Sequence, residues 1–185
     1  MNDTATRPLA AASAVGGLII TVIGAAAAIS PDIVGDTWFA TAGFAALLCA
    51  VGVFGARRVV DRSRVSRIAL AVGTGTLTLF GLAHFYAVAD EDVAVALFSA
   101  FMVLSAVSLI VAGAAAMRTR AGTQLQSTAL LVTGIWPIAT IPAGAAIGDL
   151  PHFLAIAVWG GCWMVTGVAM MRGHQVAVGS RLAGD

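Results

Sequence analysis

Six long stretches of this chain contain no charged residue, and short charged segments separate them. The stretches that we predict to cross a membrane cover residues 9–30, 37–56, 68–89, 93–117, 124–147 and 150–171. A helix needs about 20 apolar residues to cross the hydrocarbon core of a bilayer, and each stretch meets that length. Membrane barrel strands are about half as long and alternate between apolar and polar residues, which these stretches do not. The sequence therefore predicts an all-α polytopic membrane protein with six transmembrane helices.

The composition agrees with a membrane protein. Only 10% of the 185 residues are charged, against roughly 25% in a typical soluble domain. A chain of which 59% is hydrophobic lacks the polar residues that cover a water-soluble core. The net charge of +1 provides no broad basic surface, so we expect no nucleic-acid partner. The helices and their short connections use nearly the whole chain, which predicts a single domain over residues 1–185.

The basic residues all fall on one side of the predicted helices. That side carries Arg7, Arg57, Arg58, Arg62, Arg64, Arg67, Arg118, Arg120, Arg172 and Arg181. The other side carries no basic residue and has the acidic residues Asp32, Asp36, Asp90, Glu91, Asp92 and Asp149. Because an excess of Lys and Arg marks cytoplasmic loops, we predict that both termini are cytoplasmic. The arginine-rich connection over 57–67 is expected to contact anionic lipid head groups, with docking of a partner protein as an alternative.

The first stretch has a second interpretation. Arg7 before an apolar run that contains small residues is compatible with a signal peptide, but the run exceeds the roughly 7–15 residues that are typical of one.

The chain contains no lysine, which a GC-rich genome in the source organism explains most simply. We therefore expect a multi-pass protein in the plasma membrane of a GC-rich prokaryote, a haloarchaeon or an actinobacterium.

The second, fourth and sixth stretches each have an aromatic residue near the start and an arginine after the end. Phe39, Phe98 and Phe153 lie 59 and 55 residues apart, and the next arginine follows them after 18, 20 and 19 residues. This regular spacing indicates three tandem helical hairpins. Duplication of one hairpin would produce the pattern, and so would the bilayer, which favours aromatic residues at its interfaces and arginine on its cytoplasmic side.

Small residues are frequent on these helices. The glycines that we expect at helix–helix contacts are Gly16, Gly17, Gly24, Gly43, Gly52, Gly55, Gly160, Gly161 and Gly167. In lipid, such residues let helix backbones approach closely. The pattern predicts a compact bundle and permits a homo-oligomer through the Gly/Ala-rich faces. Cys49 and Cys162 lie near the middle of their stretches, where we interpret them as small buried side chains.

Polar, aromatic and proline residues gather in the half of the bundle that we predict to face outward. We expect a shallow, outward-facing pocket there, lined by His84, Tyr86, Trp136, Pro137, Thr140, Pro142, His152 and Trp159. The prolines remove helix hydrogen bonds, and neighbouring groups must satisfy the freed carbonyls. A plainer interpretation remains open for each: the prolines bend a helix, His84 is a hydrogen-bonded packing residue, and Trp38 and His152 are interfacial anchors.

We predict neither a cofactor nor a metal ion. A bis-histidine haem needs two histidines at similar depth, whereas His84 and His152 differ by about one helical turn. Acidic residues near these histidines are suitable metal ligands but have no diagnostic spacing. The chain also lacks the serine-elbow, zinc-protease and phosphate-loop motifs of common enzymes.

The absence of Asp, Glu and Arg from the predicted helix interiors is the most informative functional feature. Intramembrane ionisable residues mark ion pathways and proton relays, so an ion-coupled transporter is disfavoured. We expect a non-enzymatic membrane protein that binds a lipid or another apolar ligand, with membrane lipids as its partners. Two alternatives remain: a facilitator for a small neutral solute, and a membrane enzyme acting on a lipid or quinone with His84 as acid or base.

One prokaryotic membrane family shares several of these features. Trp38-Phe39 followed by Gly43, and Gly148 followed by Pro151-His152, resemble the six-helix family called domain of unknown function 998. That family is expected to have Asn after the aromatic residue, where this chain has Ala40. The resemblance implies the six-helix architecture and assigns no activity.

Overall fold

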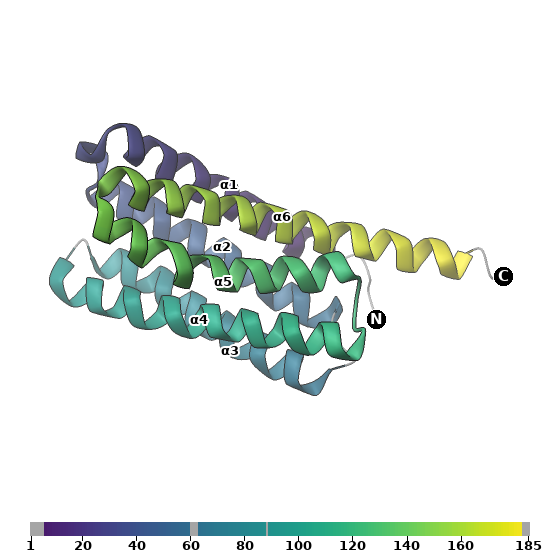
Figure 1. Ribbon diagram of the computed structural model, residues 1–185. Coiled ribbons are helices and arrows are strands. Elements are labelled where there is room, and N and C mark those ends of the chain that lie inside the picture. Colours follow the sequence, from purple (N-terminus) through teal and green to yellow (C-terminus); the bar gives the residue numbers. More distant parts are fainter. Residues whose placement is uncertain (1–5, 60–62, 88, 183–185) are drawn as a thin grey trace.

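The computed structural model describes residues 6–59, 63–87 and 89–182, and within them every long element is a helix (Figure 1). The elements are α1 (Thr6–Ile29), the 3-10 turn η2 (Pro31–Ile33), α2 (Asp36–Val59), α3 (Arg64–Tyr86), α4 (Glu91–Thr119), α5 (Gln124–Ile147) and α6 (Asp149–Leu182). All six α-helices are long and apolar enough to cross a membrane. The prediction of an all-α polytopic membrane protein is confirmed.

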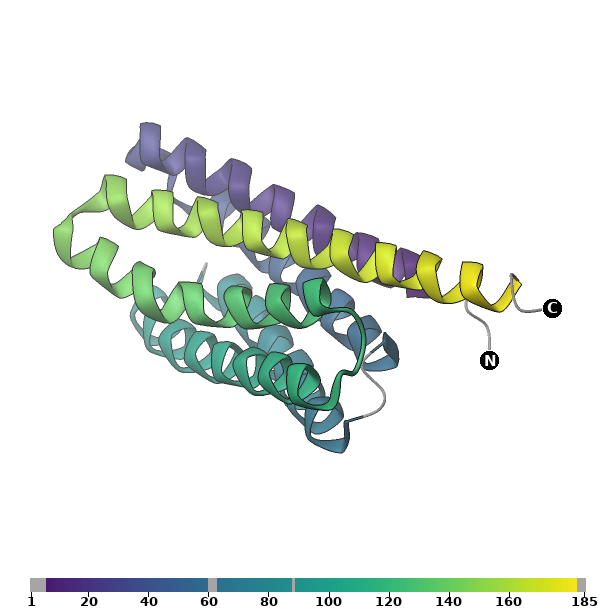
Figure 2. The same ribbon diagram turned by 45° about the vertical axis from the view of Figure 1, so that its right-hand side comes forward.

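The helices form a closed ring in chain order. Each packs against its neighbours in the sequence, and α6 returns to pack along almost the whole of α1. Figures 1 and 2 show these two helices side by side in both views. Successive helices run in opposite directions, so the chain consists of three antiparallel hairpins, α1–α2, α3–α4 and α5–α6. The first residues of α1 and the last residues of α6 lie toward the same end of the ring, beyond which α6 projects.

The sixth helix was expected over 150–171 and extends to Leu182, and the third was expected over 68–89 and occupies Arg64–Tyr86. The third helix is displaced at both ends. It begins earlier because the Ser63 hydroxyl caps it, accepting a hydrogen bond from the Ser66 N–H at 3.2 Å. It ends earlier because Asp90 caps the next helix through the Val93 N–H at 3.2 Å. The absence of charge locates a span, whereas the capping residues set its ends.

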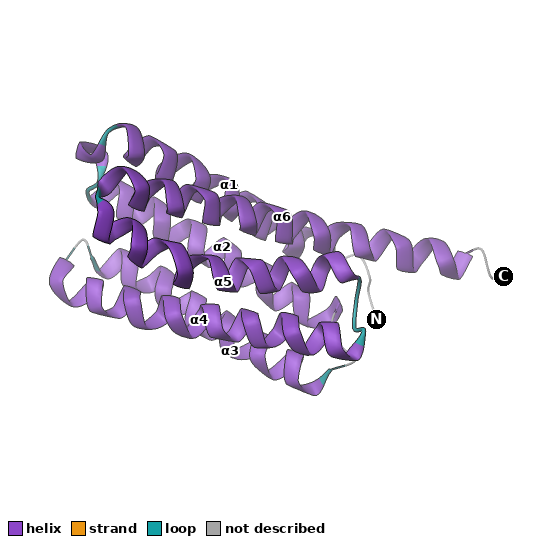
Figure 3. Ribbon diagram, viewed as in Figure 1, coloured by secondary structure: helices purple, strands orange, loops and turns teal. Residues whose placement is uncertain are grey.

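Short connections hold the hairpins together (Figure 3). Thr123 and Gln126 form a reciprocal capping box at the start of α5. Gly148 alone separates α5 from α6, with φ +147° and ψ 177°. A side chain is strained at that φ, so glycine is required for this tight reversal. The reversal places the first turn of α6 directly beside the last turns of α5.

Glycine brings α1 and α6 into close contact. A Cβ on Gly17 would lie 2.5 Å from the Gly160 carbonyl oxygen and 2.6 Å from the Met164 nitrogen. A Cβ on Gly167 would lie 2.6 Å from the Ala14 nitrogen. Most of the glycines expected at helix contacts therefore serve contacts within one chain, while an added Cβ on Gly161 would meet no atom within 4 Å. A homo-oligomer through these faces stays a prediction.

The two ends of the ring differ in charge. We call the end with the described residues Asp32, Asp36, Asp90 and Asp149 the acidic end, and the end with Arg64, Arg118 and Arg120 the basic end. Arg62 and the side chains of Arg58, Glu91, Asp92 and Arg181, which also belong to the predicted charge pattern, lie outside the described part. The segregation of charge that predicts the orientation is present in the described residues.

Large side chains fill the basic half of the ring. The side chains that are almost completely inaccessible to solvent in this half and at the middle of the ring are Val53, Leu70, Leu109, Leu130 and Trp163. Hydrogen bonds join the helices at the same levels: the Ser66 hydroxyl donates to the Ala112 carbonyl at 3.1 Å, and the Gln126 amide donates to the Ala169 carbonyl at 3.3 Å. This half of the bundle is packed along its axis.

Candidate functional site

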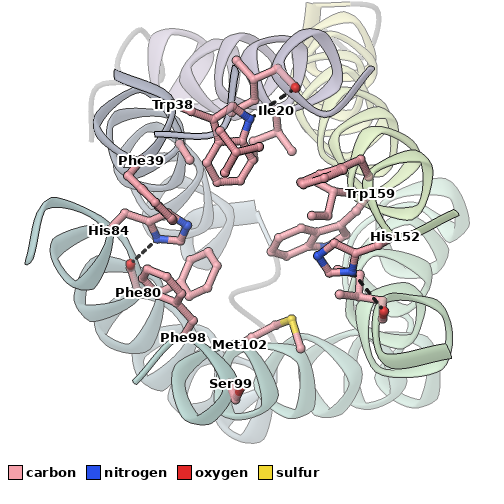
Figure 4. Close-up of a pocket in the computed structure, with 16 residues that line it drawn as sticks. Ile20, Trp38, Phe39, Phe80, His84, Phe98, Ser99, Met102, His152 and Trp159 are labelled. Atoms are coloured by element: carbon pink, nitrogen blue, oxygen red, sulfur yellow. Dashed lines mark hydrogen bonds between the residues drawn. The ribbon is translucent and has the colours of Figure 1, made fainter. Parts of the chain in front are cut away.

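The acidic half of the ring contains an internal cavity of about 320 Å³. All six helices contribute to its wall, as does the connection between α1 and α2. The lining residues are Ile20, Ile23, Val34, Trp38, Phe39, Ala42, Phe80, His84, Phe98, Ser99, Met102, Ile141, His152, Phe153, Ile156 and Trp159. Figure 4 shows their side chains converging from the surrounding helices on one central space. The wall is apolar apart from a few polar atoms.

The three repeated phenylalanines meet at this cavity. Each lies near the start of an even-numbered helix and lines the wall: Phe39 on α2, Phe98 on α4 and Phe153 on α6. The Phe39 and Phe98 rings stack with centroids 6.1 Å apart, and Phe153 contacts Trp38 edge-on at 6.2 Å. The regular spacing of these residues in the sequence thus corresponds to an aromatic layer in the ring.

Tryptophans support the wall by bonding backbone carbonyls across the hairpins. Pro137 lacks the N–H that would bond the Thr133 carbonyl inside α5. The Trp159 indole N–H donates to that carbonyl at 3.0 Å. Trp38 similarly donates to the Ile23 carbonyl at 3.3 Å. The proline therefore does more than bend the helix, because it frees an acceptor that fixes a cavity-lining indole.

His84 is held rigidly in the wall. Its Nδ1 lies 2.8 Å from the Phe80 carbonyl oxygen, one turn earlier on α3. Its ring stacks on Phe98 with centroids 4.1 Å apart, and it meets the edge of Phe80 at 4.5 Å. A carbonyl can only accept a hydrogen bond, so Nδ1 carries the hydrogen and Nε2 has a free lone pair. Figure 4 shows Nε2 directed into the cavity.

His152 lies across the cavity from His84 (Figure 4). The tight reversal at Gly148 places His152 in the first turn of α6, beside α5. Its Nδ1 lies 3.4 Å from the Ile141 carbonyl oxygen, a long contact that favours the tautomer with the hydrogen on Nδ1. The other ring nitrogen points into the cavity. Two imidazoles from different hairpins thus present acceptor nitrogens to one apolar space.

The structure separates the eight residues that sequence reasoning placed in the pocket. His84, His152 and Trp159 line the cavity, and their role in binding a ligand stays a prediction. The five others are not part of the wall: Tyr86, Trp136, Pro137, Thr140 and Pro142.

The five excluded residues have other surroundings. Tyr86 is 48% exposed on the outside of the ring. Trp136 donates its indole N–H to the Ala155 carbonyl at 2.9 Å, and the Thr140 hydroxyl donates to the Trp136 carbonyl at 2.8 Å. Pro137 is buried within the bundle, whereas Pro142 faces outward. Sequence position gave the depth of these residues, but it did not give the side of the helix on which each lies.

Sequence reasoning also missed much of the wall. Trp38, interpreted as an interfacial anchor, lines the cavity together with the three repeated phenylalanines. The regular spacing of the phenylalanines could have identified them as wall residues, because residues at equivalent positions of three hairpins lie at one level of a closed ring. Isoleucine and methionine residues complete the wall and carried no signal that distinguishes them from other core residues.

The described residues show no cluster of metal-ligating groups. No three His, Cys, Asp or Glu side chains come together in them, and Cys49 and Cys162 are both free thiols. Trp163 lies one turn below Trp159, with ring centroids 6.1 Å apart. Among the side-chain nitrogens and oxygens of the described part that are completely inaccessible, its Nε1–H alone has no hydrogen-bond partner.

No family model, curated protein or solved structure matches this chain. The resemblance to domain of unknown function 998 stays a prediction.

Proposed function

We propose that this chain is a non-enzymatic integral membrane protein that binds a lipid or another apolar molecule in the cavity of its acidic half. The observation that carries this proposal is the cavity of about 320 Å³, with apolar walls built by all six helices. Small-molecule sites span roughly 300–1,000 Å³ and are predominantly apolar, with a few placed polar groups. The cavity has room for a small molecule or for the end of a longer one.

The contrast between the two halves of the ring supports a binding role. Protein interiors are normally close-packed, as the basic half is. A cavity of about 320 Å³ leaves the apolar side chains of its wall without the packing contacts that buried side chains normally make. Water is a poor occupant of apolar walls because it needs polar partners. An apolar ligand fills this space at the lowest cost.

The same contrast disfavours the facilitator. A solute path must continue through the bundle, but Leu70, Leu130 and Trp163 are almost fully buried beyond the cavity. The enzyme interpretation needs a second titratable group within hydrogen-bond reach of His84. The hydrogen-bond partner of His84 is a backbone carbonyl, and its ring neighbours are phenylalanines. These contacts favour binding over proton transfer.

The location belongs to this proposal as well. We place the protein in the plasma membrane of a GC-rich prokaryote, with the basic end toward the cytoplasm and lipids around the ring. The positive-inside rule supports this orientation. In it, the cavity lies in the outer half of the membrane, where apolar molecules from the outer leaflet have the shorter route to it.

A brominated apolar probe tests the binding site. Trp38 and Trp159 line the cavity, so 1-bromonaphthalene bound there should quench tryptophan fluorescence saturably. Ala42→Phe fills the cavity from α2 without adding a tryptophan and should abolish the saturable quenching. Ala139→Phe adds the same ring at an exposed position on α5 and should preserve it. Equal quenching curves for the two variants would contradict the proposed site.

A further inference from the structure

We propose that the ligand of this cavity is an apolar molecule that donates a hydrogen bond, an alcohol or a phenol, and that Nε2 of either His84 or His152 accepts this bond. This inference rests on the proposed function and specifies the ligand of the same site. It follows from the hydrogen bonds that the indole and imidazole nitrogens of the wall already make.

The donors of the wall are already engaged. The indole N–H groups of Trp38 and Trp159 donate to the carbonyls of Ile23 and Thr133. The Nδ1–H groups of both histidines point to backbone carbonyls in the same way. These four bonds use N–H groups that would otherwise be available to a carbonyl, ether or carboxylate ligand.

The hydrogen bond that each imidazole can still make is therefore one that its Nε2 accepts. Among the described residues, neither Nε2 has a hydrogen-bond partner, and both point into the cavity (Figure 4). Ser99, the remaining polar side chain of the wall, has a hydroxyl that can both donate and accept, so it sets no preference. The hydroxyl of a donating ligand pairs with one of these nitrogens, whereas a ligand that has only acceptor atoms places its lone pairs against theirs.

The position of the acceptors makes this preference strong. His84 is 6% exposed and cannot turn away, because Phe98 and Phe80 hold its ring and Phe80 holds its Nδ1. A buried polar group left without a partner costs about 1–3 kcal/mol. Sites built to bond a hydroxyl reject the analogue that lacks it far more strongly than apolar pockets reject a change in size.

The same two nitrogens are suited to metal ligation, but the surroundings favour a neutral ligand. Neutral imidazole is a common metal ligand through either ring nitrogen. Within the described residues, no third His, Cys, Asp or Glu joins the pair. Two neutral imidazoles in an apolar wall would leave the charge of a bound cation uncompensated, which is costly away from water.

The test compares 1-naphthol with 1-methoxynaphthalene, which retains the ring system but has no hydroxyl hydrogen. Each compound competes with 1-bromonaphthalene for the wild-type protein in the fluorescence assay. We expect 1-naphthol to bind roughly fivefold tighter or better, from the net value of about 1 kcal/mol for one hydrogen bond. This comparison needs no variant, so it stands even if a histidine substitution impairs folding.

Two variants then assign the preference to the imidazoles. His84→Phe and His152→Phe keep an aromatic ring at each position and remove the acceptor nitrogen. Each should reduce the preference for 1-naphthol, and the double variant should abolish it while 1-methoxynaphthalene still binds. Retention of the full preference in the double variant would overturn the assignment.

The outcomes distinguish this inference from the proposed function. Equal affinity for the two naphthalenes, with both lost in Ala42→Phe, would refute the donor requirement and leave the binding site in place. Failure of either compound to compete, together with no saturable quenching by 1-bromonaphthalene, would overturn the proposed function and this inference with it. A haem absorption band in the purified protein would also overturn it, because iron would then occupy the Nε2 positions.

Discussion

At the scale of single residues, the site depends on backbone carbonyls that orient aromatic side chains. Pro137 leaves the Thr133 carbonyl without a partner inside its helix, and the Trp159 indole supplies one at 3.0 Å. Both histidines are oriented in the same way, by a ring nitrogen that faces a backbone carbonyl oxygen. Each such bond directs the rest of its ring toward the cavity, which makes the wall rigid without any charged group.

Two tryptophan substitutions test this residue-scale account. Trp159→Phe should leave the Thr133 carbonyl unpaired, at a cost of about 1–3 kcal/mol. Trp163→Phe removes a similar volume but also removes a buried N–H that has no partner in the described part. We therefore expect the melting temperature to fall several degrees further for Trp159→Phe than for Trp163→Phe, measured by thermal aggregation in detergent. Equal losses, or the reverse order, would contradict the assigned roles.

At the scale of helices, the α1–α6 contact closes the ring and therefore encloses the cavity. Its close approach depends on Gly17 and Gly160, where an added Cβ would collide with backbone atoms that cannot move independently. Gly161 lies next to Gly160 on the same helix, but an added Cβ there would meet nothing within 4 Å. Neighbouring glycines on one helix thus have different structural roles.

This difference predicts opposite effects of the same substitution. Gly17→Ala should separate α1 from α6 and lower the melting temperature by several degrees, because the added Cβ lies 2.5 Å from a carbonyl oxygen. Gly161→Ala should leave stability unchanged or raise it slightly, since Ala favours a helix over Gly by about 0.8–1.0 kcal/mol. Thermal unfolding of both variants in one detergent measures the effect. A destabilised Gly161→Ala beside an unaffected Gly17→Ala would refute the packing of this contact.

Helix number and hairpin order follow directly from the sequence, whereas the site follows only in part. Uncharged length determines a membrane helix, so the six helices were predictable. Of the residues chosen by their depth, His84, His152 and Trp159 line one cavity. The direction of a side chain depends on helix rotation, which long-range packing sets, so depth alone misplaced Tyr86 and Pro142.

At the scale of the whole molecule, the chain is a ring whose two halves differ. The basic half is packed with leucine and tryptophan, and the acidic half surrounds an apolar cavity with two inward-facing imidazole nitrogens. The basic end is thus closed by packed side chains, whereas the acidic end is hollow. We propose that an apolar molecule occupies this cavity.

Native mass spectrometry of the gently purified protein tests that claim most directly. The account predicts one adduct of a single defined mass on the wild-type protein and on Ala139→Phe, beyond any scattered bulk lipid. Ala42→Phe, with the cavity filled, should lack that adduct. Bare wild-type protein, or an adduct that persists equally in Ala42→Phe, would contradict the claim that the cavity is the binding site.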